Sequence, residues 1–242
     1  MSALMKTTRT QSAVVIVSLC MFIFVGQSHA QQKLNLQSLI KETQQTSSEP
    51  NTLTLIWWIP EQFWQASLGQ DPTLTAPQID QFLKTLRPYT VVAIVDGRVG
   101  AFGGVNYKKE DEIRASVTLK DVNGLSHAPL AESAIDPDTK NLLQFMKPVL
   151  ANMLGPVGQN TNFVLFPSKT EDGRTVVDAS REGSLHIVLS GKEYRYRLPL
   201  ASLLPPKYDS QTGESFPGTY HYNPFTGIKL VTDAPKSLPA AK

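Results

Sequence analysis

The stretch LTLIWWIPEQFWQASL, residues 53 to 68, holds all three tryptophans of the chain, Trp57, Trp58 and Trp64. Its first half is apolar at nearly every position, which predicts a strand covered on both faces. Proline is well tolerated at the first helical position, so Pro60 predicts the change from this strand to a helix that ends near Leu68. Because aromatic side chains carry the largest hydrophobic load, this stretch is the expected centre of the core.

Two interpretations of the tryptophans are open. In the first, Trp57, Trp58 and Trp64 form an exposed aromatic platform that binds a glycan, a peptide or a membrane surface. In the second, they fill the core at the junction of the strand and the helix. Large aromatic side chains are buried more often than they are exposed, so the sequence favours the second interpretation. The three tryptophans are binding candidates only under the first interpretation.

The first 30 residues have the pattern of a secretory signal peptide. Lys6 and Arg9 precede an uncharged apolar run over residues 13–25, and the tripeptide Ser-His-Ala that ends at Ala30 fits the small-x-small cleavage pattern. The apolar run is shorter than the ~20 residues that a membrane-spanning helix needs. We expect cleavage after Ala30 and release into the periplasm or the medium, with no membrane anchor left on the mature chain.

Cysteine content and charge exclude whole classes of function. The single cysteine, Cys20, lies inside the expected signal peptide, so the mature chain has no disulfide, thiol nucleophile or thiolate metal site. Without Lys6 and Arg9, 21 basic residues stand against 21 acidic residues, which is not the basic excess typical of a nucleic-acid-binding protein. The mature chain of about 210 residues is long enough to bury a sizeable core.

Two helices are indicated outside the tryptophan-rich stretch. Thr75 and Gln78 match a capping box and precede apolar residues at helical spacing, which predicts a helix that ends at Arg87. Asp136 is the expected cap of a second, longer helix. Pro148 falls inside that helix and predicts a kink or a break just before it, because proline removes one backbone hydrogen bond and clashes one turn back.

Strands are indicated by alternation and by turn pairs. Asp96–Gly97 is the expected tight turn of a hairpin that joins residues 89–95 to residues 98–102. Residues 113–119 alternate apolar with polar, as in a strand with one wet face, and residues 163–166 predict a buried strand. A further hairpin is expected around Gly191.

Hairpins with helices between them favour an α+β fold with a mainly antiparallel sheet, two to three helices packed on it and a small C-terminal ribbon-like β-hairpin. The expected organisation is a signal peptide at 1–30, a polar tether or short surface helix at 31–52, an α+β domain at 53–204, the ribbon-like hairpin at 205–232 and a flexible tail at 233–242.

Catalytic signatures such as G-x-S-x-G, H-E-x-x-H, the P-loop and G-x-G-x-x-G are absent from the sequence, and no cofactor is expected. His127, His186 and His221 lack metal-ligand spacing, so a structural role is expected for each. Ser184 and His186 alternate on one predicted strand, which does not by itself make a triad. If the chain were a cofactor-free hydrolase, its site would be assembled from a pool of distant residues: Asp96, His127, Asp178, Ser184 and His186.

Two segments near the C-terminus share the pattern x-a-x-x-b-G, at residues 208–213 and 222–227, offset by 14 residues. Together with Pro224, Lys229 and Leu230, they resemble the double knuckle of a zinc ribbon, C-x-x-C-G … C-P-x-C-G-x-K-L, with every ligand cysteine replaced. We call the replaced residues the knuckle positions: Asp209, Thr212, Asn223 and Thr226.

This resemblance implies a ribbon-like hairpin without its metal, because one carboxylate and three neutral side chains make a poor zinc site. Asp and Asn side chains can instead accept hydrogen bonds from backbone N–H groups two residues on, and glycine can take the left-handed conformation that closes each loop. The alternative is that the segments are two unrelated Asx-type turns in a proline-rich tail.

The rest of the chain resembles exported bacterial-type domains with no assigned activity. The leading hypothesis is therefore a non-enzymatic exported protein that acts by binding or assembly, with a protein or cell-envelope partner and no nucleic acid. The cofactor-free hydrolase is its rival. A third hypothesis is an edge strand within residues 185–198 that pairs with a partner or with a second copy of the chain.

Overall fold

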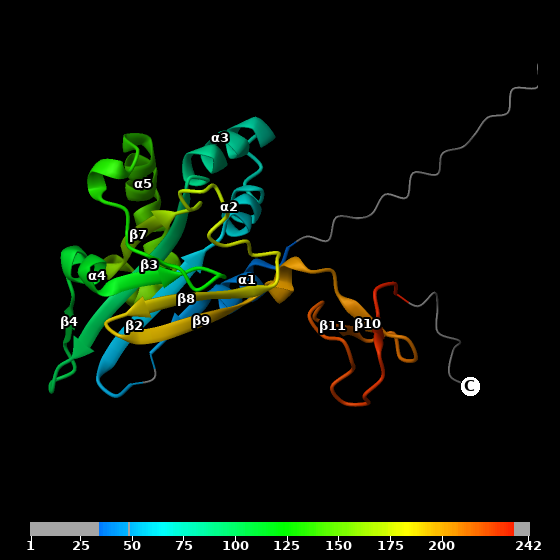
Figure 1. Ribbon diagram of the computed structural model, residues 1–242. Coiled ribbons are helices and arrows are strands. Elements are labelled where there is room, and N and C mark those ends of the chain that lie inside the picture. The colour runs from blue at the N-terminus through cyan, green and yellow to red at the C-terminus, as the bar shows by residue number, and fades with distance from the viewer. Residues whose placement is uncertain (1–33, 48, 235–242) are drawn as a thin grey trace, which may run out of the picture. The chain divides into compact units, whose positions relative to one another are not determined.

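Figure 1 shows the computed structural model of the chain, which describes residues 34–47 and 49–234. The expected signal peptide, with Cys20 and the cleavage site at Ala30, lies outside these residues. Among the described residues, no helix is both long enough and apolar enough to cross a membrane.

The tryptophan-rich strand lies in the middle of an antiparallel sheet, sheet A. Strand β2 pairs with β1 on one edge and with β3 on the other. The far edge of β3 pairs with β7 along its first half and with β4 near its end. The bounds are β1 (Gln44–Thr46), β2 (Thr52–Ile59), β3 (Tyr89–Val99), β4 (Val105–Tyr107) and β7 (Asn162–Pro167).

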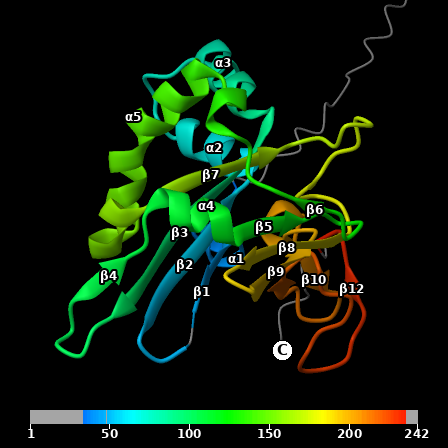
Figure 2. The same ribbon diagram turned by 60° about the vertical axis from the view of Figure 1, so that its left-hand side comes forward.

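Helices cover one face of sheet A (Figures 1 and 2). They are α1 (Leu36–Thr43), α2 (Glu61–Leu68), α3 (Ala76–Leu86) and α5 (Pro137–Met153). Trp57 points to this face, where its ring lies 4.9 Å from that of Phe63 in a T-shaped contact and its Nε1 donates to Thr43 Oγ1 at 3.1 Å. The strand and the helix of the tryptophan-rich stretch therefore pack on each other, as aromatic pairs of this geometry favour.

The capping residues act as the sequence predicts. Gln78 Oε1 accepts a hydrogen bond from the Thr75 backbone N–H at 2.8 Å, and α3 ends where Arg87 caps it. Asp136 Oδ1 accepts from the Asp138 N–H at 2.8 Å at the start of α5. Of the predicted kink or break before Pro148, the break is not present: α5 continues to Met153, with buried core residues on both sides of the proline.

A second antiparallel sheet, sheet B, covers the other face of sheet A (Figure 2). Its order is β6-β5-β8-β9, with β5 (Val117–Lys120), β6 (Ser126–His127), β8 (Gly183–Leu189) and β9 (Lys192–Leu198). Trp58 points toward this sheet, with its ring 5.9 Å from that of Tyr196, whose hydroxyl donates to the Ile56 carbonyl at 3.3 Å. Burial raises the pKa of the Tyr196 phenol. Helices and two antiparallel sheets thus confirm the α+β class.

The predicted turn at Asp96–Gly97 is wrong, because β3 runs through both residues to Val99. Tertiary contacts hold Asp96 within the strand: Thr54 Oγ1 donates to Asp96 Oδ1 at 2.8 Å, and Lys108 Nζ lies 2.6 Å from Asp96 Oδ2. The chain reverses after Val99 instead, at a loop in which Gly103 has a φ of +84°. Glycine adopts such an angle without strain.

Two further expectations need correction. Residues 110–116 form a helix, α4 (Glu110–Ser116). Of residues 113–119, which were expected to form a strand with one solvent-exposed face, only residues 117–119 are strand. The Glu112 carboxylate accepts from the Lys109 N–H at 2.8 Å and fixes the start of this helix. The described part of the expected polar tether contains α1 and β1, and Leu39 is fully buried there, because four apolar residues are enough to dock a short helix.

The C-terminal ribbon is a small three-stranded antiparallel sheet rather than a simple hairpin. Its order is β11-β10-β12, with β10 (Lys207–Asp209), β11 (Ser215–Phe216) and β12 (Leu230–Val231). The remaining elements are short 3-10 helices at Glu132–Ala134, Gly155–Asn160 and Ala201–Leu203.

Candidate functional site

A cleft opens in sheet A where β2 is shorter than its neighbour β3. Strand β2 ends at Ile59, which pairs with Val91, and Pro60 then starts the turn into α2. Tyr89 and Thr90 at the start of β3 pair with β7 but have no partner in β2. The space beside them is a cleft of about 410 Å³.

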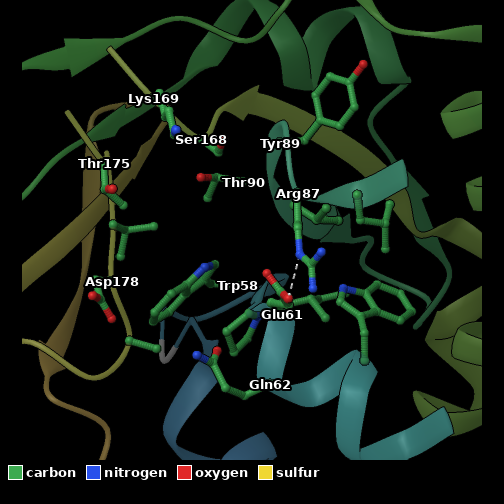
Figure 3. Close-up of a pocket in the computed structure, with 17 residues that line it drawn as sticks. Trp58, Glu61, Gln62, Arg87, Tyr89, Thr90, Ser168, Lys169, Thr175 and Asp178 are labelled. Atoms are coloured by element: carbon green, nitrogen blue, oxygen red, sulfur yellow. Dashed lines mark hydrogen bonds and ion pairs between the residues drawn. The ribbon is translucent and has the colours of Figure 1, made fainter. Parts of the chain in front are cut away.

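Segments far apart in the sequence wall the cleft (Figure 3). Trp58 and Gln62 lie below the opening in this view, Arg87 and Glu61 on one side, and Thr175 and Asp178 on the other. Residues 168–179 reach the cleft as an extended hairpin after β7. The hairpin is held by a bridge between Lys169 and Thr175 and by the Leu200 N–H, which donates to the Ala179 carbonyl at 2.8 Å.

Arg87 is held by two acids but keeps one nitrogen free. Its Nε lies 3.0 Å from Glu61 Oε1 and its Nη1 lies 3.1 Å from Asp80 Oδ1, while Nη2 has no partner among the described residues. Glu61 and then Asp80 raise the pKa of the guanidinium. Because the side chain is 43% exposed, these pairs fix its orientation more than they stabilise the fold.

Asp178 is the unpaired acid of the opposite wall. Its Oδ1 accepts from the Ser180 N–H at 2.9 Å, which orients the carboxylate. Its Oδ2 makes no hydrogen bond or ion pair within residues 34–47 and 49–234. Two residues that each keep one polar side-chain atom without a partner among the described residues, Arg87 and Asp178, therefore line opposite sides of the cleft.

The tryptophans are core residues, and two of them also line the cleft. The relative exposure of Trp57 is 0%, and that of Trp58 and of Trp64 is 2%, so these three side chains do not form an exposed platform. Trp58 and Trp64 belong to the cleft lining, and Trp57 does not. The Trp64 Nε1 is buried without a hydrogen-bond partner in the described part of the chain.

The five candidate residues of the hydrolase hypothesis do not form a single site. Asp178 lines the cleft, whereas Asp96 is held by Thr54 and Lys108 as described above. His127 Nε2 lies 3.2 Å from the Asp121 carboxylate, and Asp121 also accepts from the Asn123 and Leu125 N–H groups. Although burial favours the neutral acid, these hydrogen bonds keep the pKa of Asp121 below its usual value. His127 thus has a structural role in the turn between β5 and β6.

Ser184 and His186 do meet, and the structure adds a third member. Ser184 Oγ lies 2.8 Å from His186 Nε2, and His186 Nδ1 lies 2.9 Å from Glu193 Oε1. The second contact is close but its angle falls short of an aligned hydrogen bond. The proximity of His186 lowers the pKa of Glu193. Glu193 was not among the expected residues, although the register of the β8–β9 hairpin places it diagonally across from His186.

The two knuckles of the ribbon have the same hydrogen bonds. Asp209 Oδ1 accepts from the N–H groups two and three residues on, at 2.8 and 3.1 Å, and Asn223 Oδ1 does the same at 2.9 and 3.3 Å. Gly213 and Gly227 close them with φ of 72° and 73°. Asn223 Nδ2 donates to Asp209 Oδ2 at 2.7 Å, and both side chains are buried. This hydrogen bond holds the knuckles face to face.

Thr212 and Thr226 complete the equivalence of the knuckles. The hydroxyl of Thr212 accepts from the Glu214 N–H at 3.3 Å, and that of Thr226 from the Ile228 N–H at 3.4 Å. The hydrogen bond from Asn223, followed by those from the backbone, lowers the pKa of the Asp209 carboxyl. Among the described residues, no group of three or more His, Cys, Asp or Glu residues is arranged to hold a metal ion.

No protein-family model, curated protein or solved structure matches this chain. Its function is therefore argued from its own residues.

Proposed function

We propose that this is an exported binding protein whose cleft takes a small ligand with both a carboxylate and an amino group, such as a free amino acid or a short peptide. One observation carries the proposal: Arg87 and Asp178 lie on opposite sides of the cleft (Figure 3), and the Nη2 of the first and the Oδ2 of the second have no partner among the described residues. A zwitterionic ligand pairs its carboxylate with the first and its ammonium with the second.

The cleft is prepared for such a ligand in size and in chemistry. Its volume of about 410 Å³ falls in the range of ~300–1,000 Å³ for small-molecule sites. Glu61 and Asp80 already hold the guanidinium of Arg87, so less side-chain freedom is lost on binding. The hydroxyl-bearing residues Thr90, Ser168 and Thr175 line the same space and can satisfy the remaining polar atoms of a ligand.

Binding describes this cleft better than catalysis does. No histidine or cysteine is among the described residues that line it, so no lining nucleophile has an imidazole base beside it. The signal-peptide pattern of residues 1–30 supports export. A short peptide also fits the expectation of a protein or cell-envelope partner, and the balanced charge of the mature chain argues against nucleic acid.

The test is a calorimetric titration of the mature chain with free amino acids and with di- and tripeptides. Tryptophan emission is the second readout, because Trp58 and Trp64 line the cleft. Arg87→Gln and Asp178→Asn should each weaken binding by at least ~10-fold, the equivalent of about 1.4 kcal/mol. The matched controls are Arg98→Gln and Glu171→Gln, which change exposed residues outside the lining. Binding of neutral sugars but of no zwitterion, or full affinity in both cleft variants, would overturn the proposal.

We also infer that the C-terminal element is a zinc ribbon that has exchanged its metal for hydrogen bonds. Two observations support this: the knuckles share one hydrogen-bond pattern, and the Asn223–Asp209 bond crosses the space between them. Such an exchange suits an oxidising compartment, where paired thiols are converted to disulfides. The element then has a structural role and carries no metal chemistry.

A further inference from the structure

A second polar site lies on the outer face of sheet B. Leu185, Ile187 and Leu189 of β8 are buried, so the alternate residues Ser184 and His186 point away from the core. The same alternation in β9 leaves Glu193, Arg195 and Arg197 exposed. None of these residues lines the cleft, so this site is separate from the proposed binding function.

Ser184, His186 and Glu193 have the connectivity of a nucleophile, a base and an orienting acid. The serine oxygen lies 2.8 Å from Nε2 and the glutamate oxygen 2.9 Å from Nδ1, which are the two ring atoms that such a relay uses. Contact with His186 lowers the pKa of Glu193, so this acid is ionised at neutral pH. A small rotation of the ring aligns the Nδ1–H with Glu193, as catalytic hydrogen bonds often tighten only when substrate binds.

The arginines supply positive charge beside the serine. Arg197 pairs directly with Ser184 across the β8–β9 ladder, and Arg195 pairs with His186. Neither arginine makes an ion pair within the described residues. Directly opposed residues have Cβ atoms about 4.5–5.5 Å apart, so the guanidinium of Arg197 can reach an oxyanion formed at Ser184. The second arginine favours a substrate that itself carries negative charge.

We propose that Ser184 is an acyl-accepting nucleophile and that this face hydrolyses carboxylic esters with an anionic group. The Ser184 oxygen bonds to the carbonyl carbon while its proton passes to His186 Nε2. The ester C–O bond then breaks, and the same proton leaves with the alcohol. Water next attacks the acyl-serine and gives its proton to His186, which returns a proton to the Ser184 oxygen as the acid is released.

The first test uses mono-p-nitrophenyl succinate, an anionic activated ester, and the neutral p-nitrophenyl acetate on the mature chain. We expect release of nitrophenol, faster with the anionic ester, and a succinyl or acetyl mass increment on the peptide that contains Ser184 after acid quenching. Ser184→Ala and His186→Ala should each lower the rate on the order of 100-fold, the lower end of what a positioned base contributes. Ser126→Ala and His127→Gln are the matched controls in the same sheet and should keep the rate.

The second test separates the roles of the charged residues. Arg197→Gln should remove the preference for the anionic ester. Glu193→Gln should lower the rate, because the neutral amide does not hold the His186 ring as a carboxylate does, and Glu193→Asp should recover part of the rate. Glu193 is a positioning residue, and a Glu193→Gln rate equal to that of wild type would remove that role.

The melting temperature of each variant establishes that it is folded. Acylation of other residues, with Ser184→Ala as fast as wild type, would overturn the proposal. So would a wild-type rate no higher than that of His186→Ala. Either result leaves the ligand titration of the cleft unaffected, because no variant in this set touches a cleft residue.

Discussion

Replacing Trp57 with alanine is expected to be the most damaging single truncation in the tryptophan-rich stretch. The side chain is 0% exposed, packs on Phe63 at 4.9 Å and donates to Thr43 Oγ1 at 3.1 Å. Truncating a buried large aromatic costs about 3–5 kcal/mol, and loss of the hydrogen bond adds about 1 kcal/mol. We therefore expect Trp57→Ala to lower the free energy of unfolding by about 4–6 kcal/mol, measured by urea denaturation followed by circular dichroism.

Trp58→Ala is the internal comparison, because the two residues face opposite sides of sheet A. Trp58 packs on Tyr196 at 5.9 Å and lines the cleft, so its truncation should cost about 3–5 kcal/mol and also weaken ligand binding. Trp57→Phe should keep most of the stability and full binding. A loss below about 1 kcal/mol in both alanine variants would refute the reasoning, since it would mean that neither ring is packed in the core.

Three further predictions concern the ends of the chain. Intact-mass measurement of protein recovered from the periplasm or the medium should show a chain that begins at Gln31; recovery from the membrane with residues 1–30 attached would contradict export. Gly213→Val and Gly227→Val should each lower the melting temperature, because a β-branched residue is strained at φ near +72°; wild-type melting curves would contradict this. Cysteine at all four knuckle positions should bind one zinc per chain under reducing conditions, against none in wild type, and a folded variant without zinc would show that the resemblance is accidental.

Local sequence patterns predicted those helices, strands and turns that depend on residues close to one another in the chain. The capping residues Thr75 and Asp136 start helices because their hydrogen bonds lie within one turn of the chain. The continuous apolar run predicted β2 as a strand buried on both faces, and its burial confirms this. The knuckle glycines have the positive φ that their loops require.

The failures have tertiary causes. Asp96–Gly97 has the local signature of a turn, but a buried threonine and a lysine hold Asp96 within a long strand. Gly97 is there because a Cβ at this position would lie 2.9 Å from Val105 Cγ1, so close packing rather than turning explains the glycine. A sequence pattern does not distinguish these two uses of glycine.

The candidate site was the least predictable part. The cleft joins Trp58, Arg87 and Asp178, which come from three segments brought together only by the pairing of β2, β3 and β7. The Ser184–His186 pair was visible as an alternation on one strand. Its acid, Glu193, needed the hairpin register as well, which the turn after Leu189 determines.

Because β2 ends early, the volume of the cleft and the stability of sheet A oppose each other. If strand pairing continued past Ile59, residues 60 and 61 would fall opposite Thr90 and Tyr89, and the added ladder would fill the cleft with main chain. Proline has no N–H to donate to such a ladder, so Pro60 disfavours strand pairing beside Thr90. A substitution that lengthened β2 would make the sheet more regular at the expense of the space for a ligand, as stabilising changes near functional sites commonly do. The cleft therefore occupies the part of sheet A into which β2 does not extend.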